Sequence, residues 1–87
     1  MRIVSKPIEM IAHFRDKNIP QPLKFRLKNI DHTYSIIKVD SVTEIREEKL
    51  AGIRAYVYKC QSLIKNTEKI YELKYIIEDC KWILYKI

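Results

Sequence analysis

The sequence predicts an all-β fold, as a small SH3-like or OB-like barrel or a strongly bent antiparallel sheet of about five to seven strands. The first observation is that aromatic and β-branched residues alternate with Lys, Glu and Gln from Tyr56 to Ile87, in runs of about eight residues that end at short polar loops. The second is that only Glu44–Ala51 has a helix-like composition. The third is the length, since 87 residues provide one domain with no room for a second core.

The N-terminal part is expected to form short strands followed by a loop. Ile3-Val4 is either a short edge strand or a frayed start. Ile8–Phe14 alternates and is predicted as a strand; a short helix is the alternative, but Pro7 and the neighbouring strands favour β structure. Arg15–Pro22 contains two prolines that block ladder pairing, and it is predicted as a loop.

Leu23–Lys28 has the cleanest alternation in the chain. Its apolar residues Leu23, Phe25 and Leu27 are expected to face the core, and its three basic residues are expected to face out. The next segment, Asn29–His32, has the composition of a turn.

Tyr34–Val42 is predicted as a strand with a bulge or bend near Ile36-Ile37, where the phase of the alternation shifts. Glu44–Ala51 could be a helix with Gly52 as its C-cap, or a long strand that ends in a wide loop. We favour a strand that runs into a loop or a single turn, because so short a segment is not stable as an independent helix.

The last third is predicted to be a three-stranded meander with loops near 65–68 and 78–79. This pairing places Cys60 opposite Leu73, and Leu73 opposite Leu84. One face then collects most of the large side chains, together with Cys80. The residues that we expect to be buried together are Phe25, Leu27, Tyr58, Leu73, Tyr75, Trp82 and Leu84.

The other face of this meander has more apolar residues than one solvated face usually carries: Val57, Ile76, Ile83, Tyr85 and Ile87. Something is therefore expected to cover them. We favour a second copy of the chain, which makes these residues a predicted homodimer interface. The alternative cover is the N-terminal segment Ile3–Phe14.

The two cysteines are predicted to be reduced thiols inside the core. In the pairing above, their sulfur atoms are on the order of 15 Å apart, whereas a disulfide needs Cα atoms within about 7 Å. The chain has no segment that resembles a signal peptide or a membrane span, which predicts a cytoplasmic protein with no membrane partner.

No motif predicts catalysis, and the sequence favours a protein that is not an enzyme. His13, His32, Cys60 and Cys80 do not have the spacing of a metal site, so no metal is expected. The only glycine, Gly52, cannot build a nucleophile elbow, a P-loop or a dinucleotide fingerprint. Accordingly, no cofactor and no small-molecule substrate are predicted.

The net charge of +6 favours an anionic partner, such as nucleic acid or another polyanion. Lys24, Arg26 and Lys28 would project from one strand face about 6.8 Å apart, with Arg15 and Lys17 in the preceding loop as extensions. Tyr34 and Tyr85 are the aromatic residues outside the predicted core that could stack on bases. The alternative is an ordinary soluble face, or lysines that protect an edge strand from aggregation.

Several segments together resemble a group of short, uncharacterised bacterial single-domain β proteins with a terminal W-x-L hairpin. The matching segments are LKFRLK (23–28), Tyr34 with IIKV (36–39), Tyr58-Lys59-Cys60, YELKY (71–75) and CKWILYKI (80–87). They span about Leu23 to Ile87 and include no catalytic signature, while the segment 46–52 departs from the pattern. The resemblance implies a small bacterial β-barrel with no assigned activity.

Overall fold

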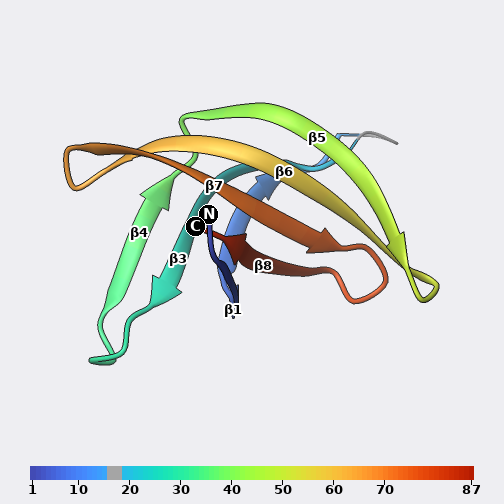
Figure 1. Ribbon diagram of the computed structural model, residues 1–87, viewed down its shortest axis with the longest axis horizontal. Helices are drawn as coiled ribbons and strands as arrows, with labels where there is room; N and C mark the ends of the chain where they lie inside the picture. The colour runs from blue at the N-terminus through green and yellow to red at the C-terminus, as the bar shows by residue number, and fades with distance from the viewer. Residues whose placement is uncertain (16–18) are drawn as a thin grey trace.

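The computed structural model describes residues 1–15 and 19–87, which form strands joined by turns and short loops (Figure 1). These residues contain no helix, and the predicted all-β class is confirmed. The strands are β1 (Ile3–Pro7), β2 (Glu9–His13), β3 (Gln21–Lys28), β4 (Tyr34–Lys38), β5 (Ser41–Leu50), β6 (Ile53–Ile64), β7 (Thr67–Ile76) and β8 (Lys81–Lys86). Only Ile8 separates β1 from β2. If these two are counted as one extended segment, the described residues form seven such segments.

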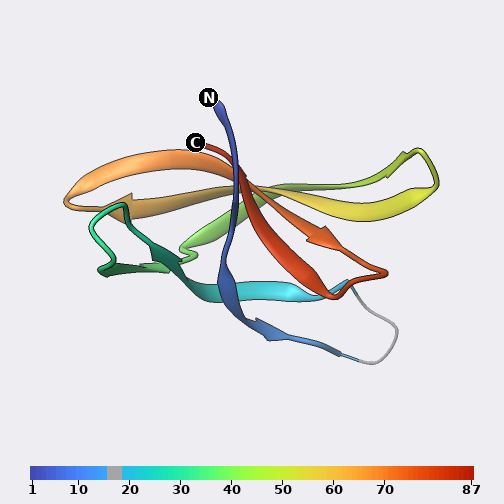
Figure 2. The ribbon, with the colours of Figure 1, turned by 90° about the horizontal axis from the view of Figure 1, so that it is seen from below.

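The strands form two antiparallel sheets, a five-stranded sheet in the order β1-β8-β7-β6-β5 and a three-stranded sheet in the order β2-β3-β4. Ile8 carries the chain from one sheet to the other, and Val39-Asp40 carries it back. Each of these two connections joins an edge strand of one sheet to an edge strand of the other. The two layers therefore make a small, strongly curved, barrel-like fold (Figure 2). The chain ends lie side by side, where the backbones of Arg2 and Ile87 exchange two hydrogen bonds of 2.8 and 3.0 Å.

The predicted C-terminal meander is confirmed, but its first pairing is two residues off. Tyr58, not Cys60, lies opposite Leu73, while Leu73 does lie opposite Leu84. The reason is the turn, which contains only Lys65 and Asn66, both at positive φ, as in a two-residue hairpin of the type favoured by strand twist.

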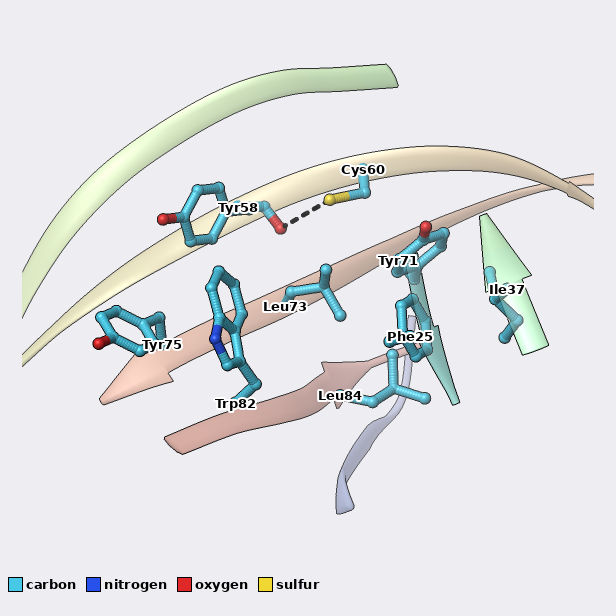
Figure 3. Close-up of a cluster of buried hydrophobic side chains, with 9 residues drawn as sticks. All are labelled: Phe25, Ile37, Tyr58, Cys60, Tyr71, Leu73, Tyr75, Trp82 and Leu84. Atoms are coloured by element: carbon cyan, nitrogen blue, oxygen red, sulfur yellow. Dashed lines mark hydrogen bonds between the residues drawn. The ribbon is translucent and has the colours of Figure 1, made fainter. Parts of the chain in front are cut away.

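The core lies between the sheets and comes mostly from the inner face of the five-stranded sheet (Figure 3). Of the residues predicted to be buried together, all are buried except Leu27, which is partly buried against the same cluster. Tyr58, Tyr75 and Trp82 form a continuous aromatic stack, with ring centroids 5.4 and 4.7 Å apart. Phe25 and Ile37 complete the cluster from the three-stranded sheet.

Hydrogen bonds link the two sheets near the start of β5, through Ser62, Tyr71 and Lys38. The hydroxyl oxygens of Ser62 and Tyr71 are hydrogen-bonded at 2.6 Å, and Ser62 also donates to the carbonyl of Lys38 at 2.7 Å. These buried hydroxyl groups therefore have partners, as a stable interior requires.

Residues 44–50 belong to the long strand β5, in agreement with the prediction of a strand that ends in a single turn. The turn is Ala51-Gly52, with φ of 51° and 81°, and it joins β5 directly to β6. Gly52 is therefore a hairpin residue and not a helix C-cap. Both settings use the left-handed conformation that glycine adopts readily, so the glycine itself does not distinguish them.

Two predictions for the middle of the chain are wrong. Leu23 is exposed, because it is the extra residue of a bulge: Ile11 pairs with Lys24, and Ala12 pairs with Pro22. The predicted bend near Ile36-Ile37 is also misplaced. The strand stays regular through Lys38, and the chain turns into the next strand at Val39-Asp40.

The two cysteines are free, as predicted, but only one of them is in the core. Cys60 is fully buried, and this burial raises the pKa of its thiol to about 12. Cys80 is exposed, so its predicted burial is wrong. It has a φ of 52° in the turn between β7 and β8, which removes it from the alternation of the strands.

Candidate nucleic-acid interface

The outward side chains of the three-stranded sheet form one continuous surface, which we call the basic face. The ladder sets three rows across it: Glu9–Arg26–Ile36, Ile11–Lys24–Lys38, and Lys28–Tyr34. All eight residues are exposed. Because side chains alternate along each strand, the residues between them, such as Phe25 and Ile37, point into the core.

Three of the predicted binding residues, Lys24, Arg26 and Lys28, lie together on this face. Arg15 is exposed but follows the last paired residue of β2, so it is not part of the rows. Lys17 lies outside the described residues.

Arg26 is held in a fixed position at the centre of the basic face. Its Nε and Nη2 atoms donate hydrogen bonds of 3.0 and 3.1 Å to the two carboxylate oxygens of Glu9. The hydrogen bonds to Glu9 and its negative charge raise the pKa of the guanidinium group above its usual value. Its Cζ atom also lies 4.2 Å from the centroid of the Tyr34 ring. Glu9 thus offsets the charge of Arg26 and orients its plane.

The three lysines of the face have no carboxylate partner within the described part of the chain. Lys24 and Lys38 are directly opposite each other on neighbouring strands, an arrangement of like charges that destabilises a sheet. A face with four cations and one carboxylate therefore carries an electrostatic cost that a bound anion would relieve.

Sequence reasoning did not identify Lys38, although it follows Ile36 at the period of two residues. The reason is the phase shift predicted at Ile36-Ile37, because such a shift would place the side chain of Lys38 on the other face of the strand. The structure keeps the phase through Lys38 and so adds a fourth cation to the face.

Apolar side chains lie beside these cations. Ile36 is 70% exposed, Ile11 is 58% exposed and Tyr34 is 48% exposed. A shallow pocket of about 330 Å³ lies around Ile11, Lys24 and Ile36, and a second one of about 200 Å³ lies around Lys28 and Tyr34. Arg26 and Glu9 line both pockets, which places the two side by side.

The outer face of the five-stranded sheet differs from the predicted homodimer interface. Val57 is fully buried, so its assignment to an open interface is wrong. Its two cross-strand neighbours are Arg46 and Lys74. Arg46 pairs with Glu72 at 3.4 Å, and Lys74 pairs with Glu48 at 2.8 Å, so paired charges flank Val57.

The other residues of that predicted interface are only partly accessible. Ile76, Ile83 and Tyr85 are half-buried, and Ile87 is 37% exposed at the C-terminus. The Nζ atom of Lys74 lies 3.8 Å from the centroid of the Tyr85 ring and so shields it. Tyr34 is therefore the more accessible of the two aromatic residues considered for base stacking.

Residues 1–15 and 19–87 contain no group of three or more His, Cys, Asp or Glu side chains that could hold a metal ion. The same residues contain no helix that is long and apolar enough to cross a membrane.

No family model matches the chain, and no curated protein or solved structure is significantly similar to it. The resemblance to short bacterial β proteins therefore stays a prediction.

Proposed function

We propose that the protein is a non-catalytic binding module that holds nucleic acid on its basic face. The observation that carries this proposal is the row in which Lys24 and Lys38 oppose each other, with no carboxylate partner among residues 1–15 and 19–87, next to Arg26 and Lys28. Unpaired cations on one face attract the phosphate groups of a polyanion, and release of the polyanion's counterions supplies the free energy of binding. A cytoplasmic location, where Cys60 and Cys80 stay reduced, belongs to the same proposal.

The test compares two variants of equal net charge. The basic-face variant is Lys24→Glu, Lys28→Glu, Lys38→Glu. The control variant changes three exposed lysines on strands of the other sheet, Lys49→Glu, Lys69→Glu, Lys81→Glu. Each replacement removes two charges, so both variants have a formal net charge of zero instead of +6.

Binding to labelled DNA and RNA oligonucleotides is measured by fluorescence anisotropy over a range of salt concentrations. The unmodified protein should bind more weakly as salt rises. The basic-face variant should bind much more weakly at low salt, and the slope of its affinity against salt should be smaller by about two counterions for a single strand. The control variant should keep most of its affinity. Equal loss in both variants, or no binding by the unmodified protein at low salt, would refute the proposal.

Self-association through the C-terminal sheet is the second candidate function. Ile70, 50% exposed on the outward side of β7, and Ile87 at the C-terminus favour it, although Val57 is no longer part of that surface. Sedimentation velocity at micromolar concentration decides the matter. A dimer that dissociates on Ile70→Glu would support this candidate, and a monomer at all concentrations would exclude it.

A further inference from the structure

We infer that the basic face takes single-stranded rather than double-stranded nucleic acid, with unstacked bases packed against Tyr34 and Ile36. This inference rests on the proposed function and adds the class of nucleic acid. It comes from the apolar side chains of the face, which attraction to phosphate alone does not explain.

Three of the four cations lie on β3, and Tyr34 and Ile36 lie on the adjacent strand β4. The cations Lys24, Arg26 and Lys28 follow one another along β3 at intervals of about 6.8 Å, and β4 lies about 4.8 Å to one side. Tyr34 on β4 is directly opposite Lys28, and Ile36 is directly opposite Arg26. A strand that ran along β3 could therefore place its phosphates over the cations and its bases over β4.

A duplex does not match this arrangement. Its bases are stacked inside, and it presents mostly phosphates and sugars to a protein surface. Ile36, which is 70% exposed on β4, would then face anions and stay hydrated. An unpaired strand offers the flat faces of its bases, which bury such side chains and stack on aromatic rings.

Arg26 and Tyr34 add a stacking platform. The guanidinium plane is held by Glu9 on one side of the group and lies against the Tyr34 ring, so both planar groups are positioned before any ligand arrives. Bases stack on tyrosine rings and on guanidinium planes alike. Glu9 therefore orients Arg26 in addition to offsetting its charge.

The experiment measures binding of a thymidine oligonucleotide of about 20 nucleotides and of a duplex of equal length, over the same series of salt concentrations. The variants are Tyr34→Ala and Ile36→Ser, and the matched control is Ile70→Ser, an exposed isoleucine on the other sheet. Near-ultraviolet circular dichroism checks that each variant keeps its core.

The unmodified protein should bind the single strand at least about tenfold more tightly than the duplex, and each face variant should lose several-fold of the single-strand affinity without a change in salt dependence. The control variant should bind as the unmodified protein does. Equal affinity for both forms, or no effect of Tyr34→Ala and Ile36→Ser, would overturn this inference and leave the proposed function standing. Absence of any binding would instead overturn the proposed function.

Discussion

The outer faces of the two sheets are built from similar residues but arranged differently. On the five-stranded sheet, Arg46 and Lys74 each contact a carboxylate, and the apolar residue between them, Val57, is fully buried. On the three-stranded sheet, Arg26 is the one cation with such a partner among the described residues, and the neighbouring Ile36 is exposed.

Because of this difference, the outer face of the five-stranded sheet stabilises the fold, whereas the basic face is open to a ligand. The long side chains of Arg46 and Lys74 lie on both sides of Val57, so their stems cover it while their charged ends pair. Lys24 and Lys38 make no such pairs with any described residue and leave the neighbouring Ile36 exposed. Substitutions on the first face should therefore change the free energy of unfolding, and substitutions on the second should change binding.

The largest difference is expected when a lysine is introduced on each face. Val57→Lys would bury a third positive charge between Arg46 and Lys74, which should cost about 3–5 kcal/mol of unfolding free energy or prevent folding. Ile36→Lys leaves its charge in water and should change the free energy of unfolding by less than about 1 kcal/mol. Urea unfolding of both variants measures the contrast, and similar losses would show that the two faces are equivalent.

Alkaline pH should destabilise the protein through the inner face of the five-stranded sheet. Burial raises the pKa of the Cys60 thiol to about 12 and that of the Tyr71 hydroxyl to about 12. In the unfolded chain these groups lose their protons near pH 9 and pH 10. The folded state thus binds more protons in this range, and its stability falls as the pH rises toward 12.

Each such group should contribute about 1.4 kcal/mol per pH unit to this fall. Chemical denaturation at pH 8, 10 and 11, scanned with a probe of secondary structure, measures the slope. A stability that stayed constant from pH 8 to 11 would show that these groups are not shielded from water.

The faces of the strands could be predicted from the sequence even where the register could not. Side chains alternate with a period of two, so a two-residue slip moves a strand along its partner without changing which residues face the core. Tyr58 pairs with Leu73 in place of Cys60, yet all three are buried. The alternation therefore predicts the core correctly despite the wrong length of the turn.

Positions that break the alternation could not be predicted in this way. Leu23 is exposed because a bulge inserts it, and Cys80 is exposed because it lies in a turn at positive φ. The burial of Val57 depends on Arg46 and Lys74, which come from two different strands and meet only when the sheet has formed. Local sequence carries no signal for such contacts.

A moderate effect is expected when one carboxylate is neutralised on each face. Glu9→Gln frees Arg26 and should increase affinity for oligonucleotides several-fold, with a salt dependence steeper by up to about one counterion. Glu72→Gln removes the buried partner of Arg46, and it should lower stability by about 1–2 kcal/mol without changing affinity. Anisotropy titrations together with urea unfolding separate the two outcomes, and a Glu9→Gln variant with unchanged affinity would mean that Arg26 does not contact the ligand.

The smallest effect is expected at Cys80, which belongs to neither outer face and lies exposed in the turn between β7 and β8. Cys80→Ser should change the free energy of unfolding by less than about 0.5 kcal/mol, because the side chain is exposed and serine is of similar size. Thiol titration of the folded protein should then show one reactive group before the substitution and none after it. Cys60 should react only on unfolding, because its buried, protonated thiol is protected from attack. β6 is paired with a strand on each side, so it should rarely open. Two rapidly reacting thiols in the folded protein would contradict this expectation.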